Sequence, residues 1–352
     1  MSSSRHNTYL HTRVSILAAR LLNHDNLAKL PQLDLERIGA LYGLEPVLDD
    51  TLPASTRNHA VERALIRTLL SELSVLIRPM QGEGRELLLY WARKFELYNL
   101  KALIRGKLSA MPEQEISDNL YEVPDALALP HQALLRTESV LELLRRLEQS
   151  PYRAIARQAR HVYEERHEPF ALEATVDQQY YAGLVKRVRE MQGTDLKEMQ
   201  QVVGITLDQL NLLWVLRYRF SYGLSASETY YQLAPSVRKL HRGELLKLVN
   251  LSSLEKVISS LPPPLDSLLE SAATTVEVER RMDTYSARET RKILLHSPSS
   301  VARAFAYLIL REMDLRKLFA VVQGKVLGLN NDLQMYALGL GDEESVMGAA
   351  RV

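Results

Sequence analysis

One polar pattern occurs three times along the chain, and it limits the folds that the chain can adopt. The segments "FELYNLKALIRGK" and "LDQLNLLWVLRYR" both place an acid three residues before Asn-Leu and two basic residues further on. A weaker third copy, "REMDLRKLFAVVQGK", has Asp-Leu in place of Asn-Leu. Each copy follows a long helix-like segment and shorter amphipathic segments in the same order, so the sequence indicates a triplicated unit.

The motif residues are those that recur at corresponding places in the three segments. They are Asn99, Arg105 and Lys107 in the first copy, Asn211, Arg217 and Arg219 in the second, and Asp314 and Arg316 in the third. In the third copy Ala320 stands where the Arg would fall, and the Gly-Lys pair comes three residues late relative to the first copy. We therefore expect the last helix to be longer or locally rewound.

Asn211 shares one helical face with apolar residues such as Trp214 and Tyr218. An unpaired buried amide there would cost about 1–3 kcal/mol. We expect the Asn or Asp of each copy to be a paired group inside a helix bundle, facing the acid-rich helix of its own repeat. Glu173 and Asp177 are the acids of that helix in the second copy. A direct ligand or partner contact is the alternative.

Helical periodicity dominates the chain, and alternation typical of strands is scarce. Apolar residues between Val61 and Ile77 form one broad stripe. Turn signals, "PMQGEG", "SP", "LPPP" and "HSP", stand where such helices should end. Two capping boxes are predicted, Thr206 with Gln209 and Ser225 with Glu228. The predicted fold class is all-α.

The repeats and the composition of their connections predict a division of the chain. The expected parts are repeat 1 over 1–115, a linker over 116–133, repeat 2 over 134–235, repeat 3 over 236–340 and a disordered tail over 341–352.

Composition excludes several classes of protein. With 44 basic and 43 acidic residues, the chain lacks the basic excess that nucleic-acid binding requires. The absence of cysteine excludes disulfides, thiolate nucleophiles and cysteine-ligated metal sites. No apolar run reaches the roughly 20 residues of a membrane-spanning helix. We expect any membrane association to be peripheral or through a partner.

Enzyme signatures are missing from the sequence. There is no phosphate-binding GxxxxGK[ST] loop, no HExxH and no GxSxG. His161 and His167 are not on one helical face and are read as ordinary surface histidines rather than as metal ligands. We therefore predict no catalytic residue, no cofactor and no metal.

One basic stripe remains to be interpreted. Arg153, Arg157 and Arg160 recur at helical spacing in "YRAIARQAR". A solvated helix face is one interpretation, and a docking patch for an acidic partner is the other.

The repeated segments resemble those of a known family. "DQLNLLWVLRYRFSYGLSASETYYQLAP" is similar to the middle repeat of the C subunit of archaeal and bacterial A/V-type rotary ATPases, the relative of the d subunit of the eukaryotic vacuolar proton pump. "KFELYNLKALIRGKL" and "REMDLRKLFAVVQGKVLGL" resemble the first and third repeats, so the resemblance extends roughly from Tyr9 to Leu329.

The resemblance implies three helical domains, related by pseudo-threefold symmetry, that form a funnel with a central hollow. It implies a non-catalytic protein of the central stalk without cofactors, a socket that links the axle (the D and F subunits) to the membrane rotor ring (the c/K subunits). Such a protein couples ATP hydrolysis or synthesis to proton or sodium transport. It would lie in the cytoplasm, peripheral on the inner face of the plasma membrane.

Two other classes of function are compatible with a helical repeat protein. One is a free-standing scaffold that brings other proteins together in the cytoplasm. The other is an all-α transferase with a site in a central cavity, for which the sequence offers no strong cluster of acids or bases.

Overall fold

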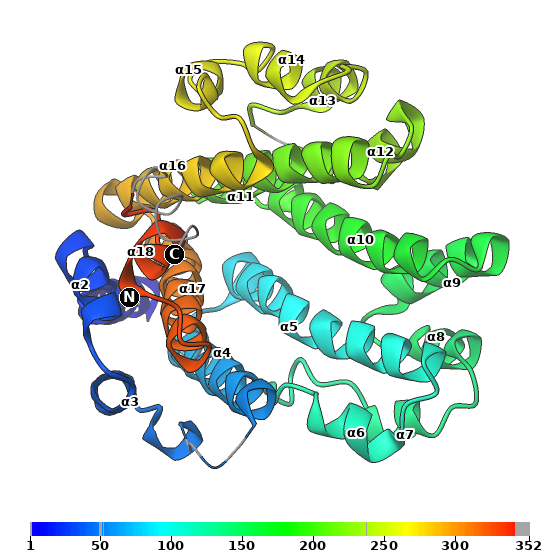
Figure 1. The fold of residues 1–352 in the computed structure, drawn as a ribbon, viewed down its shortest axis with the longest axis horizontal. Coiled ribbons are helices and arrows are strands. Elements are labelled where there is room, and N and C mark those ends of the chain that lie inside the picture. Colours follow the sequence, from blue (N-terminus) through cyan, green and yellow to red (C-terminus); the bar gives the residue numbers. More distant parts are fainter. Residues whose placement is uncertain (1, 49–50, 52, 194, 237, 342–352) are drawn as a thin grey trace. The chain divides into compact units, whose positions relative to one another are not determined.

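The structure, a computed structural model, describes residues 2–48, 51, 53–193, 195–236 and 238–341, and no strand occurs among them (Figure 1). The predicted all-α class is confirmed. The chain separates into two compact units, one of Met1–Met80 with Thr290–Val352 and one of Gln81–Glu289. The division into three repeats and their arrangement around a hollow stay predictions. The predicted tail falls, apart from residue 341, outside the described residues.

The first unit joins both ends of the chain. Its elements are α1 (Ser2–Ala18), α2 (His24–Lys29), the 3-10 turn η1 (Leu30–Gln32), α3 (Leu35–Tyr42), η2 (Glu45–Val47), α4 (Ala54–Ile77), α17 (Ser300–Val326) and α18 (Asn331–Ala337), with the last turns of α16 (Thr275–His296).

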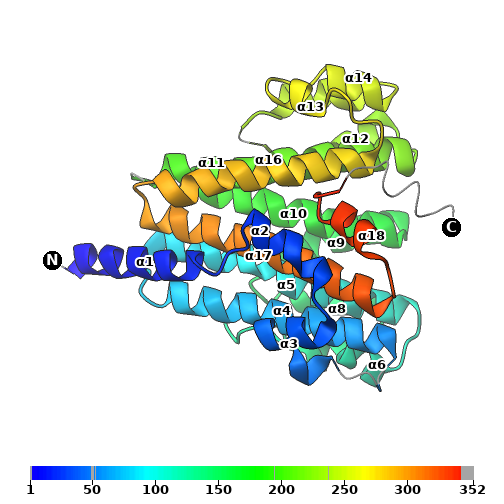
Figure 2. The same cartoon turned by 60° about the vertical axis from the view of Figure 1, so that its left-hand side comes forward.

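The core of the first unit lies along α17, which packs against both α1 and α4 (Figure 2). The apolar stripe predicted on α4 is buried there, with Leu73 and Leu76 at most 1% exposed. Phe305 and Leu308 of α17 are buried to the same degree. Helix α17 is buried on almost every side, and its buried residues include the charged Arg303, Arg311 and Asp314 as well as apolar side chains.

The second unit holds the remaining helices. They are α5 (Gly82–Leu108), α6 (Glu113–Asp118), α7 (His131–Leu135), α8 (Val140–Leu147), α9 (Arg153–Arg166), α10 (Pro169–Glu190), α11 (Leu196–Leu216), the π-helical turn η3 (Arg217–Ser221), α12 (Ala226–Gln232), α13 (Arg242–Val249), α14 (Leu254–Ser259), α15 (Leu265–Leu269) and most of α16.

Helix α10 packs against α5 as well as against α11. At the first contact the ring of Tyr90 stacks on that of Tyr180, with centroids 5.6 Å apart, and the Tyr180 hydroxyl donates to the Trp91 carbonyl at 2.7 Å. Gly183 makes this crossing possible, since a Cβ atom at that position would lie 2.0 Å from the Tyr90 hydroxyl. A close helix crossing therefore joins the segments of two predicted repeats.

The predicted turn signals lie at helix boundaries, where α4 and α5, α8 and α9, α14 and α15, and α16 and α17 are separated, although "PMQGEG" runs into the first turn of α5 and "HSP" begins at the last residue of α16. The capping box of Ser225 and Glu228 is confirmed at the start of α12. The box at Thr206 is wrong, because α11 has already begun at Leu196. The Thr206 hydroxyl donates instead to the carbonyl of Val202, 3.4 Å away. The predicted linker also contains the end of a short helix, α6.

The three helices that carry the motif copies, α5, α11 with η3, and α17, end in the same way. Each is followed by a residue with left-handed backbone, Ala110 after α5, Gly223 after η3 and Gly328 after α17. Relative to the motif Asn or Asp, this residue comes one position later in the second copy and three later in the third. The π-turn η3 absorbs the single extra residue. Helix α17 has 27 residues, as α5 does, but it extends three residues further past its motif residue, so the predicted lengthening is found at its C-terminal end.

Candidate functional site: the repeated polar positions

Asn99 of α5 and Asn211 of α11 each form two hydrogen bonds to the backbone of a single residue in the segment that follows the helix. Asn99 accepts from the Tyr121 amide at 2.7 Å and donates to the Tyr121 carbonyl at 2.9 Å. Asn211 accepts from the Ala234 amide at 2.9 Å and donates to the Ala234 carbonyl at 3.0 Å. Both side chains are fully buried. Each amide therefore replaces a backbone partner and fixes the chain segment that follows its helix.

Asp314 holds the corresponding place on α17, but its partner comes from the beginning of the chain. Its Oδ2 accepts from the Leu22 amide at 2.7 Å, and the side chain is only 6% exposed. Burial raises the pKa of Asp314 to about 6, although the Leu22 amide and the neighbouring Lys317 oppose that rise. The N-terminal segment thus supplies to α17 the kind of contact that following loops supply to α5 and α11.

The structural role predicted for the repeated Asn agrees with this geometry, but the predicted partner is wrong. Asn99, Asn211 and Asp314 bond to backbone amides outside the acid-rich helices, although Arg291 of α16, the acid-rich helix of the third copy, is one of the cations around Asp314. Asn and Asp side chains are short and match a backbone amide, so a neighbouring loop pairs with them directly. The acids of α10 instead face the motif helix of the preceding repeat: Asp177 accepts from Lys101 at 2.8 Å, and Glu173 accepts from Arg105 at 2.6 Å.

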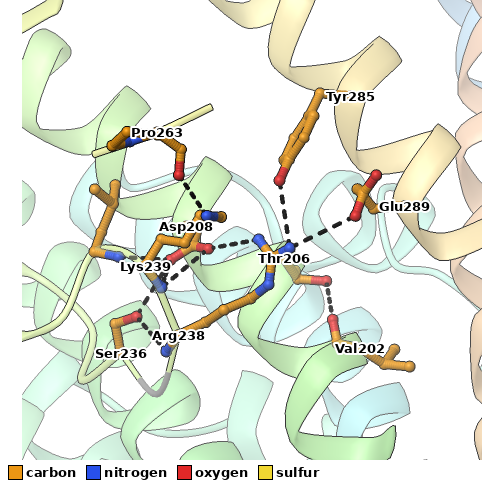
Figure 3. A network of polar contacts seen from close by, with 10 residues as sticks. Val202, Thr206, Asp208, Ser236, Arg238, Lys239, Pro263, Tyr285 and Glu289 are labelled. Carbon is orange, nitrogen blue, oxygen red and sulfur yellow. Dashed lines mark hydrogen bonds and ion pairs between the residues drawn. The ribbon is translucent and has the colours of Figure 1, made fainter. Parts of the chain in front are cut away.

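The acid three residues before each Asn fixes a second point of the loop. Glu96, fully buried, accepts from the Leu129 amide at 2.5 Å and lies 2.7 Å from His131 Nε2. Asp208 accepts from the Leu240 amide at 2.9 Å and from Arg238 Nη1 at 3.0 Å (Figure 3). Burial raises the pKa of Asp208, while those two donors act against the rise.

Figure 3 also shows how the Asp208 cluster reaches a second helix. Arg238 donates to the hydroxyl of Tyr285 at 3.3 Å and lies 3.7 Å from Glu289, both on α16. Close to it, Asp283 of α16 accepts from Gln209 of α11 at 2.5 Å. Polar contacts therefore tie α16 to the motif helix of the second copy.

The third copy reverses the charge at the position of the acid. Arg311 stands there and donates to Glu72 of α4 at 3.2 Å, and Tyr307 donates to the same carboxylate at 2.6 Å. Glu72 is 5% exposed. A buried carboxylate on one helix and a guanidinium on the other thus link α4 to α17, as the motif acids link helix to loop elsewhere.

The basic residues at the motif ends donate hydrogen bonds to backbone carbonyl groups. Lys107 donates to the carbonyls of Leu135, at 2.8 Å, and Thr137. Arg219 donates to the Val249 carbonyl at 2.8 Å, and Lys325 to the Pro31 carbonyl at 2.8 Å. Lys325 is the residue whose late position departs from the motif, and it takes this role because α17 extends further past its motif residue than α5 does.

Two predicted motif residues contribute less to packing. Arg217 and Arg316 are exposed, on η3 and α17 respectively. Arg105 is also 64% exposed, although it is paired with Glu173. These three guanidinium groups lie on the surface, unlike the buried Asn and Asp positions.

The basic stripe of α9 is partly neutralised by acids of its own unit. Arg160 pairs with Glu148 at 2.7 Å and with Glu164 at 3.0 Å. Arg157 lies 3.7 Å from the same Glu148, and Arg153 is exposed. A solvated face with ion pairs agrees with this geometry, and a docking role for the stripe stays a prediction.

Exposed apolar side chains, which the sequence pattern did not predict, lie where the three motif helices end. Leu108 is 37% exposed at the end of α5, Tyr222 is 54% exposed after η3, and Leu327 is 58% exposed after α17. Phe170 packs edge-on against Tyr222, 5.2 Å between centroids, and is itself 40% exposed. The sequence pattern does not reveal their exposure, because an apolar residue at a helix end continues the apolar periodicity whether or not a neighbouring element covers it.

The parts of the chain that the structure describes contain no group of three or more His, Asp or Glu side chains placed to hold a metal ion. Over the same residues, no helix combines the length and the apolar character needed to cross a bilayer.

Comparison with known proteins gives a consistent result over almost the whole chain. The "ATP synthase (C/AC39) subunit" family matches residues 10–334. The C subunit of the A-type ATP synthase of Methanocaldococcus jannaschii is 23% identical over 90% of this chain and 82% of its own length. That of Methanosarcina barkeri is 23% identical over 92% of this chain and 90% of its own. That of Pyrococcus horikoshii is 24% identical over 90% and 85%.

These matches span all three copies of the motif, including the buried Asn and Asp positions and the basic residues that grip the loops. The chain belongs to the ATP synthase (C/AC39) subunit family.

Proposed function

We propose that this chain is the coupling component of an A/V-type rotary ATPase. In this proposal it is a non-catalytic socket in the central stalk, holding the axle, made of the D and F subunits, on the membrane ring of c/K subunits. It would pass torque between ATP hydrolysis or synthesis and the transport of protons or sodium ions. The family match over residues 10–334 carries the proposal, together with relatives named as C subunits of A-type ATP synthases.

The internal construction of each unit supports a mechanical role. A protein that transmits torque between two partners must not deform when the partners exert forces on it in different directions. Long helices such as α5 and α17 are joined to their neighbours by polar pairs. Asn99 of α5 and Asn211 of α11 fix the loops that follow these helices, and Asp314 of α17 fixes the N-terminal segment at Leu22. Buried polar pairs favour a single register between packed elements, because any slip leaves a donor or an acceptor unpaired.

The exposed apolar helix ends support a role in assembly. Leu108, Tyr222 and Leu327 each expose more than a third of their surface. Exposed apolar side chains stabilise a complex when a partner covers them, at about 25 cal/mol for each Å² of apolar area removed from water. We assign these ends to contacts with the ring or the axle. The chain would then lie on the cytoplasmic side, attached to the membrane through the ring.

A pull-down from detergent-solubilised membranes tests the proposal. Tagged full-length chain should recover the ring and axle proteins in comparable amounts. A variant with Leu108→Ser, Tyr222→Ser and Leu327→Ser should recover fewer of them, whereas a control with three exposed residues outside the motif helices, Glu36→Ser, Lys186→Ser and Glu270→Ser, should not. Recovery of soluble proteins without ring or axle would contradict the rotor role and favour the free-standing scaffold.

A further inference from the structure

The N-terminal segment completes the third motif copy. In the first two copies, the motif amide pairs with a segment that follows its own helix, at Tyr121 and at Ala234. In the third copy, the pairing residue is Leu22, which follows α1 at the opposite end of the sequence. Asp314 is therefore the group that attaches the start of the chain to the last motif helix.

The chemistry of this attachment differs from that of the other two copies. An Asn side chain accepts from a backbone amide and donates to the same residue's carbonyl, but a carboxylate can only accept. The Leu22 carbonyl is accordingly left to Arg291, whose Nη2 lies at the long distance of 3.4 Å. A neutral carboxylic acid carries an O–H donor as well as an acceptor, so it could form both bonds that Asn99 and Asn211 form.

The charges around Asp314 come from several elements. Arg311 and Lys317 lie on its own helix, and Arg291 comes from the last turns of α16. Tyr42 of α3 also interacts with Asp314. On α4, Glu72 is already bound by Arg311 and Tyr307, so α4 presents a paired carboxylate to this region. On balance, burial outweighs the nearby cations, and the pKa of Asp314 rises to about 6.

We propose that Asp314 and Leu22 form a pH-sensitive clasp that holds the N-terminal segment, α1 to Leu22, against α17. The clasp is firmest when Asp314 is neutral and forms the two-bond pair seen in the other copies. We call the chain closed when this segment lies against α17 and open when it has detached. The clasp loosens when Asp314 ionises, because the closed state then buries a charge and leaves the Leu22 carbonyl with only the long bond from Arg291. This property is separate from the coupling function proposed above.

The size of the effect follows from proton linkage. The pKa of the Asp314 carboxyl is about 6 in the folded chain, against an ordinary value of 3.8. The closed state therefore binds the proton more tightly than the open state, so closure is favoured at low pH and weakens as pH rises through both values. If the open segment has the ordinary pKa, the opening constant rises by about tenfold between pH 5 and pH 8 and is nearly constant above pH 7.

Thiol labelling can measure this opening, because the chain contains no cysteine. Leu21 is 8% exposed and adjoins the clasp, so Leu21→Cys in the full-length chain gives one protected thiol. Its labelling rate with a small maleimide is measured from pH 5 to pH 8 and divided by the rate of the same chain in urea, which removes the titration of the thiol itself. The same series is run with Asp314→Asn, and with Asp332→Asn, an exposed acid on α18, as the matched control.

We expect the normalised labelling rate to rise about tenfold from pH 5 to pH 8 in the Asp314 chain and in the Asp332→Asn control. With Asp314→Asn it should stay flat and, at pH 8, fall below that of the Asp314 chain. A rate independent of pH in the Asp314 chain would overturn the proposal, and that test stands even if Asp314→Asn fails to fold. A faster rate with a folded Asp314→Asn chain at pH 8 would also overturn it.

Discussion

The substitution Asn211→Ala tests directly whether the motif amide fixes the following loop. It removes both hydrogen bonds to Ala234, and Ala234 is only 1% exposed. Water therefore cannot replace the lost partner without a local rearrangement. The amide N–H and the carbonyl of Ala234 are both left unpaired in the buried state.

The expected loss of unfolding free energy follows from the number of buried groups that the substitution leaves unpaired. Each buried backbone group left without a partner costs about 1–3 kcal/mol, so the two groups together set a range of about 2–6 kcal/mol. Shifts of the 233–236 segment that admit water reduce this cost. We therefore expect the unfolding free energy of the second unit to fall by about 2–4 kcal/mol.

Tryptophan fluorescence isolates this unit in the assay. The chain has two tryptophans, Trp91 and Trp214, and both lie in the second unit. Urea unfolding followed by their emission should show a lower midpoint in Asn211→Ala. The matched control is Asn250→Ala, because Asn250 is exposed and donates only within its own helix region, to Leu246; its stability should stay within about 0.5 kcal/mol of the parent. A loss below that figure in Asn211→Ala would refute the structural role.

Three further outcomes follow from single contacts of the second unit and use the same fluorescence assay. Gly183→Ala should lower stability by about 1–3 kcal/mol, since the new Cβ overlaps the Tyr90 hydroxyl; an unchanged midpoint would contradict the crossing of α5 and α10. Lys101→Met should destabilise the unit more at pH 8 than at pH 5, because burial already raises the pKa of Asp177 and acid neutralises a carboxylate left without its cation; an equal loss at both pH values would disprove this. Ser225→Ala should cost about 1 kcal/mol through loss of the capping box, and no cost would mean that α12 does not depend on it.

Local pattern predicted much of the fold. The helical period of α4, the turn signals between long helices and the capping box at Ser225 all report interactions between residues close in sequence. The prediction at Thr206 failed because a Thr and a Gln three residues apart also occur inside a helix, where the hydroxyl bonds back to Val202. A capping box is decided by where the chain stops being helical, and the apolar pattern before Thr206 was continuous with the rest of α11.

The repeated motif predicted which polar residues are buried, but it did not predict the residues to which they bond. Repetition identified Asn99, Asn211 and Asp314 as special, and all three are buried and paired. Their partners lie in loops of irregular composition, at Tyr121, Ala234 and Leu22, where no periodic pattern marks a residue. The contact between Asp314 and Leu22 joins two distant parts of the chain, so no window of sequence contains it. The exposed helix ends were missed for a similar reason, since exposure depends on which neighbour fails to cover them.

The proposed coupling between two parts of a rotary machine can be measured in inverted membrane vesicles from a strain that lacks the gene for this chain. ATP hydrolysis and ATP-driven ion uptake are recorded together, with and without the restored full-length chain. Without the chain, we expect ATP hydrolysis to drive no ion uptake, and we expect the restored chain to return the ion-to-ATP ratio to its parental value. Ion uptake driven by ATP at an undiminished ratio in the absence of the chain would contradict the coupling role.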